Sequence, residues 1–482
     1  MGLIIDLFAG GGGTSLGIER ALGRSPDIAI NHDPEAVAMH RANHPATRHY
    51  CENVWAVNPR EATKGQPVDF LWASPDCKHF SKAKGGKPRD KKIRALAWVI
   101  VKWAAWTRPR VVAMENVEEF QQWGPLDRSG RPIKGLAGTT FNNFVNALRK
   151  LGYKVSYREL KACDYGAPTI RKRFFLIARC DGAPIVWPAK THGVGTGRKY
   201  RTAAECIDWA ISCPSIFDRD KPLAENTMKR IAKGVVRYVL NNPAPYITRE
   251  CSDKAQDNKS ALCAAFLAQY HTEQKESEVR GCALDAPLNV VDSSPRYALC
   301  SAALITKQYT SNDVGSKVDR PLPTITASDH NALTECLLVR QFGTSVGQPL
   351  DAPANTVMPG GCGGKTGLVA ALLQKYYGSG KSGADISDPM PTVTAKDRIG
   401  LVTVTVGGVK YAVADIGMRM LQPRELFRAQ GFGDDYIIDP EYNGKPLSKS
   451  AQVRMCGNSV CPPVAEAIVR ANCGEMAARK VA

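Results

Sequence analysis

Leu3-Ile4-Ile5-Asp6-Leu7-Phe8-Ala9-Gly10-Gly11-Gly12-Gly13-Thr14 joins an apolar run to a glycine-rich turn, and a helical pattern begins at about Ser15. An apolar strand that passes through glycines into a helix is typical of the first turn of a nucleotide-binding α/β sheet. Glycines let the backbone approach a ligand without a Cβ clash, and the helix N-terminus adds a partial positive charge. The stretch predicts an α/β fold with a nucleotide or nucleoside ligand, although glycine-rich turns are common and this one alone is weak evidence.

Beyond this turn the pattern divides the chain into three segments. Residues 1–188 alternate apolar runs with helical patterns, which predicts a parallel sheet with helices on both faces. Residues 189–415 carry short Thr/Val runs broken by Gly, Pro and Asp, which predicts a separate, mostly β domain. Residues 416–482 return to helical patterns, and the last helix is long enough to pack on the first domain. Strands are expected at Leu3–Ile5, Ile28–Asn31, Phe70–Ala73, Val111–Met114, Lys154–Tyr157 and Phe174–Ala178, and helices at Ala36–Ala42, Phe141–Leu151, Pro423–Gln430 and Val464–Ala478.

Composition restricts the partners. The 482 residues are too many for one ordinary core, and a net charge of +18 favours a polyanion, most simply nucleic acid. The 15 cysteines include no C-x-x-C pair, which argues against a zinc ribbon or a thioredoxin-type motif. An odd number of cysteines without a secretion signal indicates reduced thiols and a cytoplasmic protein. No apolar run approaches the roughly 20 residues that span a bilayer, so no membrane partner is expected.

A cysteine follows the apolar run Val68–Ala73 in the turn Ser74-Pro75-Asp76-Cys77. The turn lies at the carboxyl edge of the predicted sheet, where open α/β sheets bind ligands. A thiol there can act as a nucleophile if its pKa is lowered and its electrophile is held in place. A purely structural cysteine is the alternative, and the neighbouring motifs favour the nucleophile.

Other polar residues follow neighbouring strands. Glu115, at the end of the run Val111–Met114, can hydrogen-bond a base edge or donate a proton, or it can simply terminate the strand. Asp33 can accept hydrogen bonds from ribose hydroxyls, cap the next helix, or do both. Arg171 and Arg173 share a face of the following strand and can grip a phosphate or carbonyl; a solvated basic edge is the alternative.

His40 and His44 are spaced i, i+4 on one predicted helix. That spacing can hold a metal, but the sequence supplies no further ligands at metal spacing. We therefore expect ordinary helix-surface histidines and no metal site.

Taken in chain order, these pieces resemble the DNA (cytosine-5) methyltransferase family. The matching segments are Asp6–Gly13 for the Asp-x-Phe-x-Gly-x-Gly-Gly signature, Cys77 for the catalytic-loop cysteine, Glu115–Val117 for Glu-Asn-Val, Thr140–Ala178 with Asp164-Tyr165-Gly166 inside it, Thr169–Arg173 for Gln-x-Arg-x-Arg, the Arg424-Glu425 helix, and Gly457-Asn458-Ser459-Val460. Two positions depart from the family pattern. Asp76 is inserted into the usual Pro-Cys pair, with Lys78 in place of the following Gln, and Thr169 replaces the first Gln of the arginine motif.

The resemblance implies a Rossmann-like methyltransferase domain, S-adenosyl-L-methionine as cofactor, and methyl transfer to C5 of cytosine in double-stranded DNA. It implies that Cys77 adds to C6, that Glu115 holds the N3 edge, and that Arg173, together with Arg171, completes the catalytic set. The target base must be flipped out of the duplex for this chemistry. The cofactor contacts that the resemblance implies are Phe8 on the adenine, Gly10, Gly11, Gly12 and Gly13 in the loop, Asp33 on the ribose, Glu52 near the adenine amino group, and Asn458 with Val460 from the last motif.

The segment 82–94 is strongly basic, with Asp90 as its single acidic residue and Gly85-Gly86 as a hinge. A mobile lid that closes on DNA phosphates fits this composition, and a plain solvated loop is the alternative. The DNA contacts expected in and beside it are Ser81, Lys82, Lys84, Lys87 and Arg89.

The middle domain contains a repeat. Asp-x-Pro units begin at Asp285, Asp319 and Asp351, and a related Asp-Pro-x-Pro unit begins at Asp388. The four recur at a spacing of roughly 35 residues, which indicates stacked supersecondary units. Their Thr-Ile/Val pairs resemble the Thr-Leu element through which the family's target recognition domain meets DNA. Thr392 stands nearest to the next motif, as that element does, and is expected to contact DNA.

Other functions share parts of the pattern. An RNA (tRNA) cytosine-5 methyltransferase would carry most of these motifs, and the Asp76 insertion allows a catalytically impaired DNA-binding relative. A nicotinamide oxidoreductase fits the glycine loop but gives no role to Cys77 or Glu115. We expect a monomeric enzyme of a bacterial or phage-infected cell; a cognate restriction endonuclease is a candidate second partner, which the sequence alone does not identify.

Overall fold

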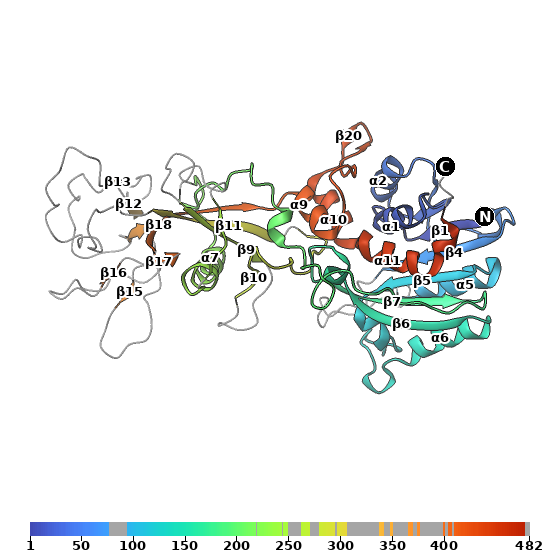
Figure 1. Cartoon of the computed structure of the whole chain (residues 1–482). Helices are drawn as coiled ribbons and strands as arrows, with labels where there is room; N and C mark the ends of the chain where they lie inside the picture. Colours follow the sequence, from blue (N-terminus) through green and yellow to red (C-terminus); the bar gives the residue numbers. More distant parts are fainter. Residues whose placement is uncertain are drawn as a thin grey trace, which may run out of the picture. The chain divides into compact units, whose positions relative to one another are not determined.

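The computed structural model describes residues 1–76, 94–217, 219–242, 244–248, 262–269, 279–294, 296–305 and 409–477, together with short strands between 337 and 406. The chain forms two compact units (Figure 1). The first unit comprises 1–207, 285–296 and 421–482, and the second comprises 208–284 and 297–420. The units therefore change at Ile207 and Leu421 rather than near 188 and 415, and a short segment of the middle region belongs to the first unit.

The first unit is built on a seven-stranded sheet with the order β3-β2-β1-β4-β5-β7-β6. Its strands are β1 (Leu3–Leu7), β2 (Ile28–Asn31), β3 (Arg48–Cys51), β4 (Val68–Ala73), β5 (Val111–Asn116), β6 (Lys154–Lys161) and β7 (Lys172–Arg179). Six strands predicted from the apolar runs are present, and β3 was missed because only its Tyr50 and Cys51 are apolar. The expectation of a wholly parallel sheet is wrong at β7, which runs antiparallel to β5 and β6 because residues 162–171 return the chain to the sheet at the edge where β6 ends.

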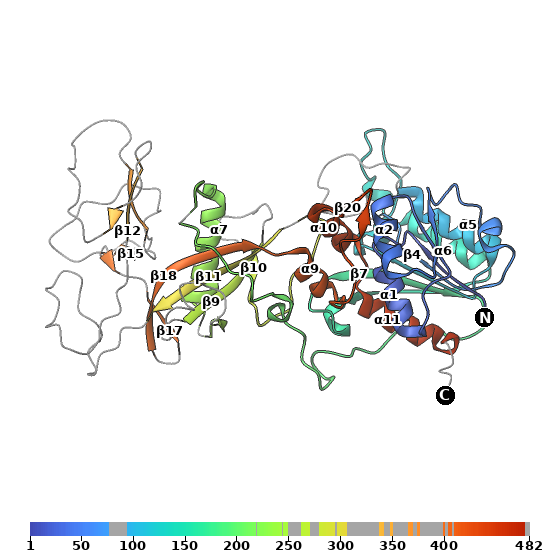
Figure 2. The ribbon, with the colours of Figure 1, turned by 90° about the horizontal axis from the view of Figure 1, so that it is seen from above.

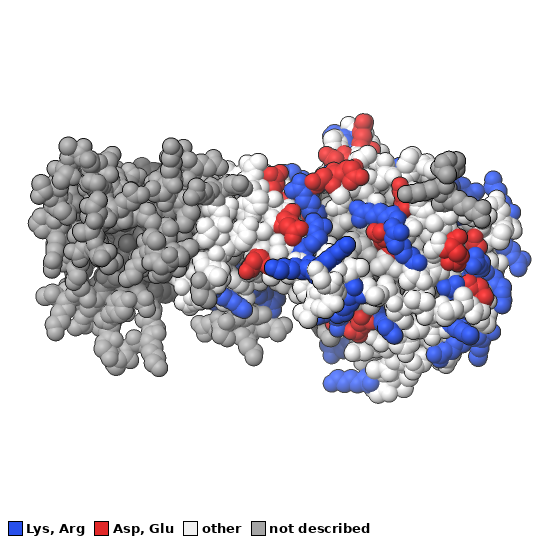
Figure 3. Space-filling view, viewed as in Figure 1, with Lys and Arg blue, Asp and Glu red and all other residues white. Residues whose placement is uncertain are grey.

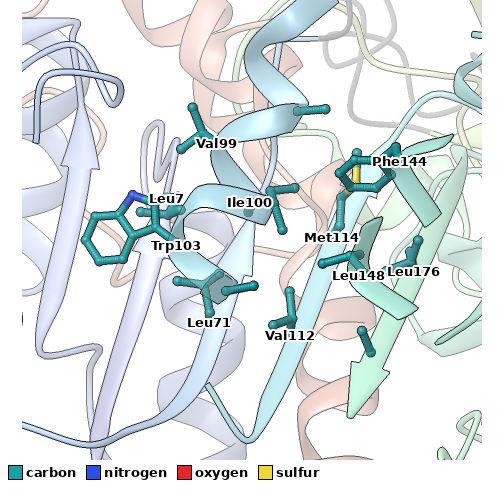
Figure 4. Close-up of a cluster of buried hydrophobic side chains, with 14 of the residues drawn as sticks. Leu7, Leu71, Val99, Ile100, Trp103, Val112, Met114, Phe144, Leu148 and Leu176 are labelled. Carbon is teal, nitrogen blue, oxygen red and sulfur yellow. The ribbon is translucent and has the colours of Figure 1, made fainter. Parts of the chain in front are cut away.

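Alternate side chains of the strands enter two different cores. Leu71, Val112 and Leu176 face one side, where α5 (Trp98–Thr107) and α6 (Thr139–Lys150) cover them (Figure 4). Phe70 and Val111 face the other side. Strands buried on both faces read as nearly continuous apolar runs, which is why the sequence located them well.

α1 (Gly13–Leu22) and α11 (Pro462–Cys473) lie side by side on that second face, in both views of the ribbon (Figures 1 and 2). Ile18 of α1 and Val464 of α11 share a core cluster with Phe70 of the sheet. The expected return of the C-terminal helix to the first domain is therefore confirmed, although the helix ends at Cys473 rather than at 478. The remaining helices of this unit are α2 (Pro34–Asn43), α3 (Pro59–Thr63), α9 (Pro423–Gln430) and α10 (Lys449–Asn458), with a small hairpin of β19 (Glu441–Tyr442) and β20 (Lys445–Pro446).

The second unit centres on the long antiparallel strands β9 (Leu262–Gln269), β11 (Tyr297–Ile305) and β18 (Val409–Met420). A helix that the sequence analysis missed, α7 (Glu225–Val235), packs on this sheet and continues as a π-helical turn, Val236–Leu240. Its buried Ile231, Val235 and Val239 follow helical spacing, so the signal was present. The shorter strands are β8 (Ile247–Thr248), β10 (Gly281–Cys282), β12 (Leu337–Gln341), β13 (Gln348–Pro349), β14 (Lys365–Val369), β15 (Gln374–Lys375), β16 (Ile399–Gly400) and β17 (Thr403–Val406).

Candidate active site

The candidate site lies at the carboxyl edge of the sheet in the first unit. β1 pairs with both β2 and β4, so the chain order reverses at β1 and a switch point forms beside it. The turn after β1 carries the glycine loop, the turn after β4 leads to Cys77, and the end of β5 carries Glu115. The topology therefore brings three of the predicted motifs to one edge.

Glu115 and Arg173 form an ion pair at this edge. The Oε1 atom of Glu115 lies 3.3 Å from Nε of Arg173, and the two side chains are 10% and 18% exposed. Burial raises the pKa of the Glu115 carboxyl above its ordinary value, while the charges of Arg173 and Arg171 act in the opposite direction. A carboxyl with a raised pKa can carry a proton nearer to neutral pH and can then donate a hydrogen bond.

The turn that leads to Cys77 is tied to both neighbouring strands. The Nδ2 atom of Asn116 donates to the carbonyl of Pro75 at 3.1 Å, and the amide of Ser74 donates to the carbonyl of Leu7 at 3.2 Å. Asp76, the inserted residue, ends this described turn. Cys77 itself lies outside the described residues, and so do Ser81, Lys82, Lys84, Lys87, Arg89 and Thr392.

Arg171 is buried and is held by a segment from the middle of the chain, residues 285–296, which we call the 285–296 strap. Its NH1 group donates to the carbonyl of Val291 at 2.8 Å. Thr169, which replaces the family's Gln, is fully buried and donates through Oγ1 to the carbonyl of Asn289 at 3.0 Å. The amide of Ile170 also donates to the strap, at the carbonyl of Leu288. The arginine motif thus serves both as the support of Arg173 and as the docking edge for the strap.

The four glycines of the first loop have different surroundings. A Cβ on Gly10 would meet nothing nearer than the Phe8 carbonyl at 3.8 Å, so this position is open. A Cβ on Gly12 would clash with the hydroxyl of Tyr436, and one on Gly13 with the side chain of Ser459. The Tyr436 hydroxyl also donates to the carbonyl of Gly11 at 2.5 Å. The absence of side chains at Gly12 and Gly13 is therefore required for packing of the C-terminal segment, and Gly10 is the glycine that leaves space for a ligand.

The predicted cofactor residues follow three adjacent strands. Phe8 follows β1 and has a positive φ of 63°, Asp33 follows β2, and the exposed Glu52 follows β3. Asp33 caps α2 by accepting from the Glu35 amide at 3.1 Å, so the helix-cap interpretation is confirmed. Arg454 of α10 also pairs with Asp33, a contact that no pattern in the sequence indicates.

Arg454 joins α10 to the N-terminus of α2 through ion pairs with Asp33 and Glu35. The two carboxylates raise the pKa of the Arg454 guanidinium against the opposing effect of its partial burial. On the last motif, Asn458 is exposed at the C-terminal end of α10, whereas Val460 is buried in the core beside α1. The C-terminal segment therefore contacts the expected cofactor edge at two places, through Arg454 at the N-terminus of α2 and through Val460 beside α1.

The expectation that His40 and His44 lie on a helix surface is wrong, because each is 1% exposed. His40 Nδ1 lies 2.8 Å from Nε2 of His49, and its Nε2 lies 2.9 Å from Oγ of Ser15, which donates to Asp6 at 2.8 Å. These distances form a chain that runs from the half-buried His49 to the fully buried Asp6. Within the described part of the chain, no group of His, Cys, Asp or Glu side chains is arranged to hold a metal ion.

Burial dominates the pKa values in this chain. It lowers the pKa of His40 well below its ordinary value and raises the pKa of Asp6 to about 7. Ser15 opposes the shift of Asp6 by donating a hydrogen bond to it. Both groups are therefore held mainly neutral beneath the glycine loop at mildly acidic pH.

No helix in the described part of the chain is both long and apolar enough to cross a membrane. On the face drawn in Figure 3, Lys and Arg side chains occupy several separate parts of the described surface, with Asp and Glu between them.

Comparison with known proteins agrees with this geometry. The family model for C-5 cytosine-specific DNA methylase matches residues 3–473. The type II methyltransferase M.XorII of Xanthomonas oryzae is 30% identical over 67% of this chain and 72% of its own length, and M.DdeI of Desulfomicrobium norvegicum is 30% identical over 73% and 79%.

Other relatives align over a shorter span. M.AquIA of a Picosynechococcus strain is 28% identical over 39% of this chain and 77% of its own length, whereas M1.HphI of Haemophilus parahaemolyticus is 29% identical over 42% of this chain and 51% of its own length. The match of the family model extends over nearly the whole sequence, including both the glycine loop and the last motif. The chain therefore belongs to the C-5 cytosine-specific DNA methylase family, whose members are cytosine-5 DNA methyltransferases.

Proposed function

We propose that this protein transfers a methyl group from S-adenosyl-L-methionine to C5 of a flipped-out cytosine in double-stranded DNA, through a covalent bond between Cys77 and C6. The observation that carries the proposal is the Glu115–Arg173 pair, which lies at the same sheet edge as the turn leading to Cys77. A buried carboxyl and a guanidinium side by side match the N3 and O2 edge of a cytosine.

The chemistry requires each of these groups. C5 of cytosine is a weak nucleophile, so the Cys77 thiolate adds to C6 and turns the C5–C6 double bond into an enamine. Glu115 donates a hydrogen bond to N3, and Arg173 holds the O2 carbonyl, so that the charge of the addition step is stabilised. After C5 has gained the methyl group, loss of its proton restores the double bond and expels the Cys77 sulfur.

S-Adenosyl-L-methionine supplies the electrophilic methyl group when it is bound. The open position at Gly10, with Phe8, Asp33 and Glu52 after three adjacent strands, fits an adenosine: an aromatic side chain suits the base, and carboxylates suit the ribose hydroxyls and the adenine amino group. Asp33 is already paired with Arg454, so we expect it to bind the ribose through a shared carboxylate.

The proposal also assigns separate roles in DNA binding to two segments of the chain. The second domain, expected at 189–415, serves as the target recognition domain, and the basic segment from Lys82 to Arg94 serves as the lid. We expect a monomer acting beside a cognate restriction endonuclease, since several relatives are named as type II methyltransferases.

The decisive experiment measures transfer of a radiolabelled methyl group to duplex DNA and, separately, to tRNA. Transfer to DNA alone is the expected result, and bisulfite sequencing of the product locates the methylated cytosine. The Cys77→Ser variant should lose transfer while it still binds the cofactor, because a hydroxyl is far less ionised than a thiol near neutral pH. Substantial turnover by that variant, or transfer confined to tRNA, would contradict the proposal.

Duplex containing 5-fluorocytosine tests the covalent step independently. Fluorine replaces the proton that must leave C5, so a protein–DNA adduct stable to denaturation should accumulate with the wild-type protein and not with Cys77→Ser. Methylated DNA without any trapped adduct would rule out the covalent route.

A further inference from the structure

A cationic loop between β7 and the 3-10 helix Ala203–Cys206 has no role in the mechanism above. Residues 190–201, which we call the 190–201 loop, include Lys190, Arg198, Lys199 and Arg201. No carboxylate occurs between Asp181 and Glu205. The loop therefore carries four cations and no acidic residue; carboxylates outside it pair with Lys190 and Arg201, which leaves Arg198 and Lys199 as its exposed positive charge.

A single buried carboxylate fixes both ends of this loop. Asp164 Oδ2 lies 3.0 Å from Nζ of Lys190, and Asp164 Oδ1 accepts a hydrogen bond from the hydroxyl of Tyr200 at 3.0 Å. The amides of Thr191 and His192 donate to the main-chain carbonyl of Asp164, at 2.9 and 3.1 Å. Because the two ends are tied to the same residue, the loop is held as a closed turn.

Asp164 places the loop at the catalytic edge of the sheet. It lies in the 3-10 helix Ala162–Tyr165, directly after β6, and the amide of Ala162 donates to the carbonyl of Arg171 at 2.9 Å. Leu160 of β6 pairs with Arg173, the partner of Glu115. Asp164, which anchors the loop, is therefore four positions along the chain from Leu160, the residue that pairs with Arg173.

The part of the loop from Val194 to Lys199 is largely exposed and carries few bulky side chains, so another molecule can approach its backbone closely. Val194 is 99% exposed, and a Cβ on Gly195 or Gly197 would have no neighbour within 4 Å. Arg198 and Lys199 are exposed, and the described residues place no carboxylate within ion-pair distance of either. Bare backbone flanked by accessible cations can contact a phosphate chain, whereas bulky side chains would hold it away.

We propose that the 190–201 loop binds phosphates of the DNA duplex beside the target cytosine, through Arg198 and Lys199 and independently of base sequence. This inference rests on the proposed function and adds a DNA contact in the first unit, separate from the basic lid and from the target recognition domain. Its effect is to hold the duplex against the catalytic edge while the base is extruded.

The test compares Arg198→Gln/Lys199→Gln with the wild-type protein in duplex binding at increasing NaCl concentration. The slope of log Kd against log salt should fall by about 0.9 for each phosphate contact that is lost, and duplexes with and without the target site should weaken alike. The matched control is Arg149→Gln/Lys150→Gln, which removes the same charge from the exposed end of α6 at the opposite edge of the sheet. An equal decrease in slope for both double variants would overturn the inference in favour of general charge attraction.

A second variant tests the anchor without a change of charge. Tyr200→Phe removes the hydrogen bond to Asp164, so we expect duplex affinity to fall by roughly two- to tenfold, the scale of one hydrogen bond. Unchanged affinity in this variant would show that a fixed loop is not needed. If the wild-type protein binds duplex DNA and the loop variants bind it equally well with the same salt dependence, this inference alone is contradicted. If the wild-type protein fails to methylate DNA, the proposed function is contradicted.

Discussion

At the scale of single residues, environment rather than residue type decides the chemistry of the buried carboxyl groups, as Glu115 and Asp6 illustrate. Glu115 lies beside Arg173 and Arg171, whose charges oppose the effect of burial on its pKa. Among the described residues no cation pairs with Asp6; burial raises its pKa to about 7, and the hydrogen bond from Ser15 opposes that rise. Glu115 lies at the carboxyl edge of the sheet, and Asp6 belongs to the chain of side chains that includes Ser15 and His40.

Glu115→Gln should slow formation of the covalent adduct by roughly two to four decades, the usual effect of a positioned acid–base group. The amide keeps the shape and one hydrogen bond but cannot carry the titrating proton. Single-turnover adduct formation on 5-fluorocytosine duplex measures this step directly. If the rate does not change, Glu115 only terminates its strand.

Asp6→Asn should change how the stability of the protein depends on pH. Because the folded pKa of Asp6 lies above its ordinary value of 3.8, the folded protein holds a proton that the unfolded chain has lost between about pH 4 and 7. The contribution of Asp6 to stability is therefore complete below pH 4 and is lost as the pH rises to about 7.

The measurement is urea unfolding of wild type and Asp6→Asn across this pH range. The histidines beneath the loop act in the opposite sense, since their lowered pKa values destabilise the folded protein as pH falls below 6.5. Subtracting the two proteins removes that shared effect, so the advantage of wild type over the variant should decrease as pH rises. A difference that is constant with pH would mean that Asp6 does not titrate in this range.

At the scale of elements, the C-terminal helices complete the first domain. Arg454 of α10 contacts α2, Ser459 directly after α10 contacts the glycine loop, and Val464 of α11 contacts the sheet core. Gly457 at the end of α10 meets the 285–296 strap, since a Cβ there would clash with the main chain of Asp292. Segments that are distant in sequence are thus held together by close backbone packing.

Gly457→Ala should destabilise the protein by roughly 1 to 3 kcal/mol, the usual cost of forcing extra volume into a packed interior. Gly474→Ala is the matched control, because its Cβ would meet nothing within 4 Å and its backbone is already helical. That control should be neutral or slightly stabilising. Thermal and urea unfolding of the two variants measure the difference in stability. Equal stabilities would show that the 285–296 strap can move to accommodate the added methyl group without measurable cost.

At the scale of the whole molecule, we propose that the repeats of the second domain determine how many DNA sequences the protein can read. The Thr-Ile/Val pairs that include Thr324, Thr356 and Thr392 fall outside the described residues, so their roles are argued from sequence. Position favours Thr392 as the DNA contact and the earlier copies as stacked supports.

Thr392→Ala should weaken specific binding or alter which cytosine is methylated, at a cost of about 1 to 3 kcal/mol for a lost hydrogen bond in a buried interface. Thr324→Ala and Thr356→Ala should mainly lower the thermal unfolding temperature. Methylome sequencing of cells that express each variant distinguishes these outcomes. If each substitution abolished methylation at a different sequence, the repeats would be independent recognition units.

The sequence by itself determined the elements whose signal is local. Strands buried on both faces stand out as apolar runs, so β2 has the predicted bounds and the bounds of β1, β4 and β5 are close to the predicted ones. The helix α9 also has the predicted bounds. The order of short motifs was enough to identify the family, because each motif is a contiguous stretch of sequence that can be recognised without knowledge of the fold.

Only the tertiary structure decided which distant residues meet. The antiparallel direction of β7, the burial of His40, the pairing of Arg454 with Asp33 and the docking of the 285–296 strap on Arg171 depend on contacts between segments far apart in the chain. Local propensity and periodicity carry no information about such contacts, since the free energy that selects them comes from burial and pairing in the folded state.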